Sequence, residues 1–342
     1  MRTDDFDFNL PEELIAQTPI LNRSESKLLV LDKKTGEITH EHFYNIIKYL
    51  DENDILVLNN TKVIPARIYG VKESTGAKIE LLILKNLEKD IYQCLVKPAR
   101  RIHVGDVVSF NEGLLRVKCV AVHEEGIVDF EFLYEGVLLE ILDKIGSMPL
   151  PPYIREKLND KDRYQTVYAK NHGSAAAPTA GLHFTPELIE KIKAKGVTVC
   201  YVTLHIGLGT FRPVSVEDVT KHVMHTEEYF VSQETADILN EGMKNNKRIV
   251  AVGTTSTRTL ESAFDIQTNS FRECHDDTNI FIYPGYKFKV VDAQITNFHL
   301  PKSTLVMLVS AFANKEMILN AYEEAIENKY RFFSFGDSMF IK

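Results

Sequence analysis

The stretch RIVAVGTTSTRTLES, residues 248–262, decides the fold class of this 342-residue chain. Its first part, Arg248 to Val252, is a short apolar run bounded by Gly253, which predicts a buried strand. Four hydroxyl residues follow, and we expect a helix from Thr259 to Phe264. A buried strand that leads through a glycine turn into a helix is typical of α/β proteins.

The same alternation of strand and helix extends outward from this stretch. Helices are predicted over 185–196, 232–244, 303–313 and 315–330, and strands over 27–31, 55–58, 197–206 and on both sides of 283–286. Between them, residues 63–132 form short β-rich runs separated by turn residues, which is typical of a small barrel or sandwich. We therefore predict a large discontinuous α/β domain, 1–62 plus 147–342, with an inserted small all-β barrel domain, 63–146.

Composition excludes several classes of protein. Hydrophobic residues are 44% and charged residues 26% of the chain, a normal globular profile. The longest apolar run, 305–313, is far shorter than the ~18 residues of a membrane span, and the acidic N-terminal segment does not resemble a signal peptide. We expect a cytoplasmic protein without a membrane partner. The net charge of −8 argues against a general nucleic-acid coat protein but allows a local RNA-binding patch.

No metal site is predicted. The four cysteines form no C-x-x-C pair, so neither a zinc site nor a disulfide framework is supported. His222 and His225 resemble half a metal site, but no third ligand stands at a recognised spacing.

The best local candidate for a ligand site is the loop that begins at Gly253. Backbone N–H groups and hydroxyls at the start of a helix bind anions, and Arg258 would add a forked contact. The candidate substrate-binding residues here are Gly253, Thr254, Thr255, Ser256 and Arg258. The run is not a P-loop, because the P-loop pattern is absent. The alternative interpretation is an ordinary capped turn between strand and helix.

A second candidate loop is HIGLGTF, residues 205–211. It lacks the third glycine of a dinucleotide fingerprint, yet Gly207 and Gly209 would let a ligand approach the backbone, with Thr210 beside them. Histidines gather in this half of the chain, and histidine is the natural proton carrier near neutral pH. Each of them is, as an alternative, a hydrogen-bonded structural residue.

Two basic clusters are candidates for RNA binding. One is KPARR, residues 97–101, in the β-rich segment, and the other follows residue 154 and is interleaved with tyrosines. Cations beside aromatic rings suit a nucleic-acid groove, although a solvated charged face is the commoner meaning. The candidate tRNA-binding residues are Lys97, Arg100, Arg101, Arg155 and Arg163.

Several long segments, in order along the chain, resemble one family. They include LVLNNTKVIPARIYG (56–70), SMPLPPYI (147–154), GSAAAPTAGLHF (173–184), TLHIGLGTFRPV (203–214), AVGTTSTRTLES (251–262) and YRFFSFGDSMFI (330–341). The chain resembles the S-adenosylmethionine:tRNA ribosyltransferase-isomerases of queuosine biosynthesis from about residue 4 to the end. One departure is Asn60, where the family usually has aspartate.

The resemblance implies a fold and an activity. The fold is a large α/β domain plus a small β-barrel. The enzyme would move the ribosyl group of S-adenosylmethionine to 7-aminomethyl-7-deazaguanine at the wobble position of a tRNA, giving epoxyqueuosine and releasing adenine and methionine. No cofactor is implied, because S-adenosylmethionine is consumed as a substrate, and we expect a monomer. The candidate catalytic residues are His183, His205, His225, Glu227 and His299.

Two other function classes stay open at this point. A tRNA methyltransferase would use the same S-adenosylmethionine but leave S-adenosylhomocysteine, and its usual G-x-G-x-G loop is not seen. A non-catalytic RNA-binding protein would have a strong basic bias, which the net charge contradicts.

Overall fold

The computed structural model describes residues 1–342 except 157, 159, 208–213 and 215. It divides into two units. The first comprises residues 1–61, 152–171 and 178–342, and the second comprises residues 62–151 and 172–177. The second unit thus extends a few residues beyond the predicted insertion of 63–146 and also takes in a short later segment.

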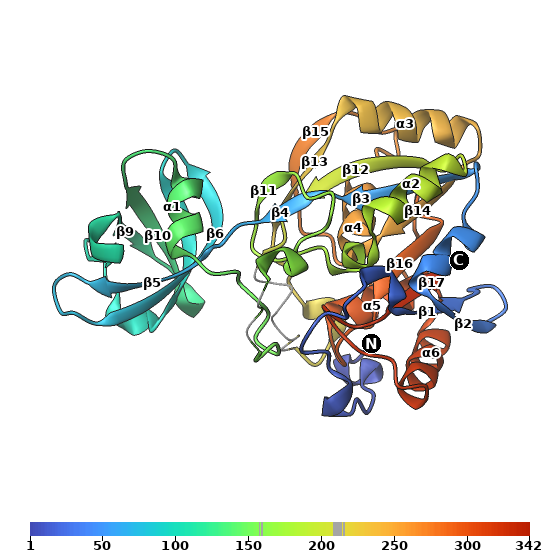
Figure 1. The fold of residues 1–342 in the computed structure, drawn as a ribbon, viewed down its shortest axis with the longest axis horizontal. Coiled ribbons are helices and arrows are strands. Elements are labelled where there is room, and N and C mark those ends of the chain that lie inside the picture. Colours follow the sequence, from blue (N-terminus) through green and yellow to red (C-terminus); the bar gives the residue numbers. More distant parts are fainter. Residues whose placement is uncertain (157, 159, 208–213, 215) are drawn as a thin grey trace. The chain divides into compact units, whose positions relative to one another are not determined.

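The first unit is built on a nine-stranded mixed sheet, whose strands occur in the order β15-β13-β12-β3-β14-β16-β17-β1-β2 (Figure 1). The central strands β12, β3, β14 and β16 are parallel to one another, and β13 and β15 continue the sheet in antiparallel pairing. The bounds are β1 (Lys27–Leu31), β2 (Ile38–His42), β3 (Asp54–Asn59), β12 (Thr198–Leu204), β13 (Glu227–Val231), β14 (Arg248–Val252), β15 (Cys274–Thr278), β16 (Ala293–Asn297) and β17 (Ser338–Ile341).

Helices of this unit cover the sheet with their apolar faces. Leu188, Ile189 and Ile192 of α2 (Pro186–Ala194) share one face and pack into the core beside Leu56 and Val250 of the sheet. Burial of each such side chain is worth about 1.5–3 kcal/mol. The other helices are α3 (Gln233–Lys244), α4 (Gly253–Ala263), α5 (Thr304–Phe312) and α6 (Lys315–Glu327).

Helix starts follow the predicted capping residues. The side chains of Thr185, Ser232 and Ser303 accept hydrogen bonds from backbone N–H groups in the first turns of α2, α3 and α5. Pro11, followed by Glu12 and Glu13, favours the start of a helix, but the structure has only a 3₁₀ turn here, Glu12–Leu14. Further 3₁₀ turns cover Thr3–Phe6, Arg23–Glu25, Phe43–Tyr49, Ala99–Arg101, Asn111–Gly113, Glu124–Gly126, Lys161–Tyr164, Thr179–His183 and Val219–Lys221.

The second unit is a closed antiparallel barrel with strand order β10-β7-β6-β5-β8-β9, followed in the chain by the helix α1 (Leu138–Ile145) (Figure 1). Its residues alternate between buried and accessible along β9 and β10, as the wall of a filled barrel requires. The predicted fold class, α/β with an inserted small β-barrel, is confirmed. The barrel strands are β5 (Arg67–Lys72), β6 (Lys78–Glu88), β7 (Ile91–Lys97), β8 (Val107–Phe110), β9 (Leu115–Val122) and β10 (Ile127–Leu133), and a two-stranded ribbon joins β4 (Thr61–Val63) and β11 (Asn171–Ser174).

Candidate active site

Predicted site residues from distant parts of the chain meet at one edge of the large sheet. His205 directly follows β12, Gly253 directly follows β14, and His299 lies two residues after β16. These strands are parallel, so their carboxyl ends share an edge. Glu227 begins β13, which is antiparallel to β12, and therefore lies at the same edge. The carboxyl edge of an α/β sheet is where such folds bind ligands.

A buried ion pair joins three elements at this edge. Glu227 and Arg258, whose side chains are 3% and 6% exposed, form a salt bridge between Oε2 and Nη1. The other carboxylate oxygen of Glu227 accepts a hydrogen bond from the backbone N–H of Gly207, at 2.9 Å. Nε and Nη2 of Arg258 have no hydrogen-bond partner among the described residues. The pair thus ties the end of β12 to α4 and leaves two buried guanidinium donors available.

The loop predicted between Gly253 and Arg258 is instead the beginning of a helix. This part of the prediction was wrong, because α4 begins at Gly253 rather than at Thr259. Two hydroxyls of the run find partners inside this helix, since Thr257 donates to the carbonyl of Gly253 at 3.2 Å and Thr259 to that of Thr255 at 3.0 Å.

The start of α4 still has the features of an anion site. Gly253 has a positive φ of 86°, a conformation that favours glycine. The buried hydroxyls of Thr255 and Ser256 have no partner among the residues that the structure describes, and Thr254 is buried beside them. A helix of 11 residues begins here, with its N-terminal backbone donors at the carboxyl edge of the sheet.

His183 is buried and uses both ring nitrogens. Asn297 donates through Nδ2 to the carbonyl of Phe333, so its Oδ1 faces His183 Nε2 at 3.0 Å. His183 therefore donates through Nε2 and accepts at Nδ1 from the hydroxyl of Ser26, at 2.7 Å. Burial lowers the pKa of His183 to about 4, so the ring is neutral at pH 7. This arrangement therefore favours a positioning role for His183 over a role in proton transfer.

The other three candidate histidines differ in their surroundings. His205 is half-buried, its Nδ1 lies 2.7 Å from the hydroxyl of Thr61, and burial lowers its pKa. His299 is buried, with Nε2 at 2.8 Å from the hydroxyl of Thr296, and burial lowers its pKa to about 3. His225 is exposed and lies two residues before β13, at the same edge of the sheet. Nε2 of His205 has no hydrogen-bond partner among the described residues.

We expect the fold to lose stability in acid because of His183. Its pKa lies below the value of about 6.5 in the unfolded chain, so the unfolded state binds more protons as the pH falls from 6.5 to 4. The free energy of unfolding should therefore fall by about 2 kcal/mol between pH 7 and pH 5 from this residue alone. Urea unfolding at both pH values measures the loss. The variant His183→Gln should show a smaller loss, with His225→Gln as the exposed control, and an equal loss in all three proteins would contradict the assignment.

Two of the predicted substrate-binding residues, Gly209 and Thr210, lie outside the described residues. Gly207 is described, and its backbone N–H donates a hydrogen bond to Glu227.

The predicted tRNA-binding residues fall into both units. Lys97, Arg100 and Arg101 are exposed in the barrel unit.

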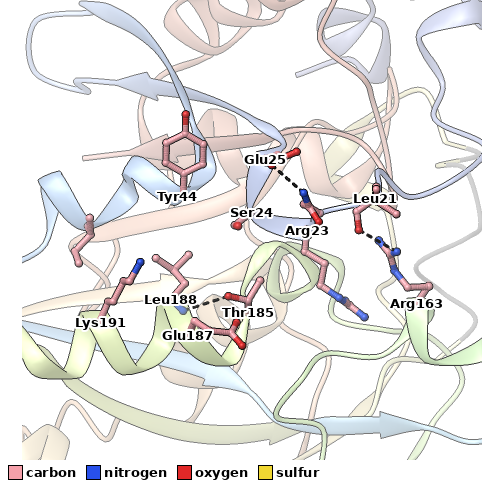
Figure 2. Close-up of a pocket in the computed structure, with 12 residues that line it drawn as sticks. Leu21, Arg23, Ser24, Glu25, Tyr44, Arg163, Thr185, Glu187, Leu188 and Lys191 are labelled. Atoms are coloured by element: carbon pink, nitrogen blue, oxygen red, sulfur yellow. Dashed lines mark hydrogen bonds between the residues drawn. The ribbon is translucent and has the colours of Figure 1, made fainter.

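The remaining predicted tRNA contacts belong to the first unit. Arg155 is exposed and forms a salt bridge of 3.3 Å with Glu12. Arg163 donates to the backbone carbonyls of Ile20 and Leu21, and it lines a surface cavity of about 670 Å³ together with Arg23 (Figure 2). Arg163 therefore anchors the chain near residue 20, and its contact with tRNA stays a prediction.

Sequence reasoning did not single out the asparagines at the strand ends. Asn297 ends β16 and orients His183. Asn59 ends β3, is fully buried, and exchanges hydrogen bonds of 3.1 Å with both backbone groups of Leu204 at the end of β12. Asn59 could have been predicted, because it is a polar residue that directly follows the apolar run at 55–58. Polar residues at the carboxyl end of a buried parallel strand lie at the edge of the sheet where ligands bind.

Comparison with known proteins identifies the family. The model of the queuosine biosynthesis protein family matches residues 3–341. The chain belongs to this family. It is also similar to the crystal structure of an S-adenosylmethionine tRNA ribosyltransferase from Thermotoga maritima, with 40% sequence identity and a TM-score of 0.57 over 99% of this chain and 100% of that one. The family resemblance drawn from the sequence motifs is confirmed.

Two further findings concern metal binding and membrane insertion. Within the described part of the chain, no cluster of three or more histidine, cysteine, aspartate or glutamate side chains has the geometry of a metal site. No helix among the described residues is both long and apolar enough to span a membrane.

Proposed function

We propose that the chain transfers and isomerises the ribosyl group of S-adenosylmethionine onto 7-aminomethyl-7-deazaguanine at the wobble position of a tRNA. The product is epoxyqueuosine in the tRNA, with release of adenine and methionine. The observation that carries the proposal is the family match over residues 3–341, supported by the 40% identity to the ribosyltransferase from Thermotoga maritima.

The start of α4 is the proposed site for the carboxylate of the methionine moiety. Arg258 has two buried guanidinium donors without partners among the described residues, and the hydroxyls of Thr255 and Ser256 are likewise unpartnered there. A charge-assisted contact to a carboxylate would satisfy these donors, and the helix dipole favours the same negative charge. Glu227 holds Arg258 in place through its buried salt bridge.

His205 is the proposed proton acceptor. The sulfonium of S-adenosylmethionine acidifies the neighbouring C5′ protons of the ribose, so a neutral imidazole is a suitable base. Thr61 holds Nδ1 of His205, and the lowered pKa keeps the ring neutral at pH 7 while Nε2 stays free of described partners. Proton transfer by a positioned side chain is worth roughly 10²–10⁴ in rate. His225 remains the candidate for protonating the departing adenine. His299 is not, because burial lowers its pKa to about 3 and the ring is neutral at pH 7.

The remaining parts of the proposal concern partners and location. The enzyme uses no metal or cofactor, since S-adenosylmethionine itself is consumed. It acts as a monomer in the cytoplasm on a tRNA that already carries the deazaguanine precursor. Lys97, Arg100 and Arg101 of the barrel unit, which are exposed cations, are the proposed contacts to the tRNA phosphates.

Product analysis tests the proposed reaction. We expect incubation with S-adenosylmethionine and precursor tRNA to release adenine and methionine in equal amounts, matched by the increase in modified nucleoside. Mass analysis of the small molecules and of the digested tRNA measures all three. A reaction with unmodified tRNA should release none of them. If S-adenosylhomocysteine accumulates instead, the chain is a methyltransferase and the proposal fails.

A further inference from the structure

A surface cavity of the barrel unit lies on the outer face of β5, β6 and β8. It has a volume of about 680 Å³. Tyr69 and Val71 are alternate residues of β5, so both side chains point outward, and the two residues are 62% and 46% exposed. Val71 lies between two paired residues, the exposed Lys78 of β6 and Ser109 of β8. We call this surface, with Lys97 at its other side, the Tyr69 face.

The Tyr69 face places a cation in the same cross-strand row as the tyrosine ring. Glu80 of β6 is paired with Tyr69 on one side and with Lys97 of β7 on the other, so the three side chains lie next to one another on one face. The carboxylate of Glu80 is compensated by Arg67, whose Nε lies 3.4 Å from its Oε1. Glu112, which also lines the cavity, follows β8 and is separated from Lys97 by β5 and β6. The side of the cavity nearest β7 is therefore favourable for an anion.

The ring of Tyr69 is not used by the packing of the barrel. Tyr92 and Phe132 of the same unit contact each other, with ring centroids 4.5 Å apart. Tyr69, in contrast, contacts no other aromatic ring among the described residues, and most of its surface is exposed. An exposed tyrosine ring offers a rigid flat face, and the bases of single-stranded nucleic acids stack on such rings.

The proposed contacts to the tRNA phosphates adjoin the Tyr69 face. β7 ends at Lys97, and the turn Ala99–Arg101 follows it. The carbonyl of Arg101 accepts a hydrogen bond of 2.9 Å from Nζ of Lys72, which holds this turn at the end of β5. A polynucleotide bound at the turn through its phosphates thus has the exposed side chains of β5 beside it. Two exposed apolar side chains are too small a surface for a stable protein interface, which buries about 800 Å² on each partner.

We propose that the Tyr69 face binds an unpaired segment of the tRNA, with one base stacked on the ring of Tyr69 and with Lys78 and Lys97 beside the neighbouring phosphates. The inference rests on the proposed function for the identity of the nucleic acid. Stacking accepts any base, so this contact adds affinity for an unpaired segment without reading its sequence.

Three substitutions separate the aromatic ring from the other properties of the side chain. Tyr69→Phe keeps the ring and removes the hydroxyl, whereas Tyr69→Leu keeps an apolar side chain and removes the ring. The control is Tyr44→Leu, the same change at a tyrosine of the first unit that is 45% exposed. Because both tyrosines are exposed, the variants should have the Tm of the wild type, which is measured first.

Titration with precursor tRNA in the absence of S-adenosylmethionine gives the Kd of each protein without turnover. We expect Tyr69→Leu to bind about 5- to 150-fold more weakly than the wild type, and Tyr69→Phe and the control to stay within twofold of it. A Kd of Tyr69→Leu within twofold of the wild-type value would overturn the proposal. An equal loss in Tyr69→Phe would also overturn it, because the hydroxyl rather than the ring would then make the contact.

Fluorescence tests the stacking directly. The chain contains no tryptophan, so the variant Tyr69→Trp has a single fluorophore on the Tyr69 face. The matched variant is Leu133→Trp, at a residue of β10 that is 38% exposed on the opposite wall of the closed barrel. We expect precursor tRNA to quench the fluorescence at position 69 and to leave that at position 133 nearly unchanged.

No quenching at position 69, or equal quenching at both positions, shows that no base stacks on this face. These binding measurements need no turnover, and the product analysis above tests the reaction separately. If epoxyqueuosine forms while the Tyr69 variants bind like the wild type, the Tyr69 face is refuted and the proposed function stands.

Discussion

The free energy of unfolding of the Arg258→Ala variant is expected to be about 3–5 kcal/mol lower than that of the wild type. The substitution leaves the carboxylate of Glu227 buried at the carboxyl edge of the large sheet without its charged partner. Urea unfolding followed by circular dichroism measures the loss. The matched control is Arg272→Ala, since Arg272 is exposed and its removal should change stability by less than about 0.5 kcal/mol. Equal stability of the two variants would contradict the buried pair.

A milder change separates the ligand contact from stability. The variant Arg258→Lys keeps the positive charge beside Glu227 but removes the forked guanidinium donors. Loss of one charge-assisted contact costs roughly 1.5–3 kcal/mol, so the Michaelis constant for S-adenosylmethionine should rise about 10- to 150-fold. The affinity for tRNA should stay near the wild-type value. The opposite pattern, with weaker tRNA binding and unchanged S-adenosylmethionine binding, would assign the start of α4 to the RNA backbone.

The sequence predicted elements well where periodicity and turn residues agree. The β-rich runs predicted within 63–132 correspond to the six barrel strands, because each of these strands alternates or runs apolar between turn residues. Strands β2, β4, β11, β13 and β17 were missed. β2 is an edge strand with no buried residue, and β17 is a four-residue buried strand whose pairing with β1 joins chain segments some 310 residues apart.

The candidate site was predictable as a set of loops but not as a set of contacts. Glycines and histidines after apolar runs marked the carboxyl edge of the sheet, because parallel strands bring such residues together. The pairing of Glu227 with Arg258, and of His183 with Asn297, joins residues 31 and 114 positions apart. No local pattern encodes these partners, since they depend on how the strands are ordered in the sheet.

The hydroxyl-rich start of α4 has a different explanation. Threonine and serine have modest helix propensity, which placed the predicted helix start at Thr259. In the structure Thr257 and Thr259 bond to carbonyls of the preceding turn, and the run is buried against the sheet. Tertiary packing therefore extends the helix back to Gly253, and the backbone donors of the candidate site belong to the N-terminus of a helix rather than to a loop.

Removal of the barrel cations is expected to weaken tRNA binding and reduce its dependence on salt. Lys97, Arg100 and Arg101 are exposed, and each phosphate contact contributes about 0.7–0.9 to the slope of log affinity against log salt. The triple variant with glutamine at these positions should therefore lower the slope by about 2–3. Titration of precursor tRNA at several salt concentrations gives the slope for each protein.

The comparison needs a variant with the same change in net charge. Lys89, Lys118 and Lys144 are exposed lysines of the same unit, and their replacement by glutamine alters the overall charge equally. If both triple variants lower the slope to the same degree, the barrel attracts tRNA only through its general field. A loss confined to the 97–101 variant identifies direct phosphate contacts. An unchanged slope in that variant means that the tRNA backbone is bound by other residues. Since the chain as a whole is acidic, with a net charge of −8, localised contacts are the outcome that its electrostatics favour.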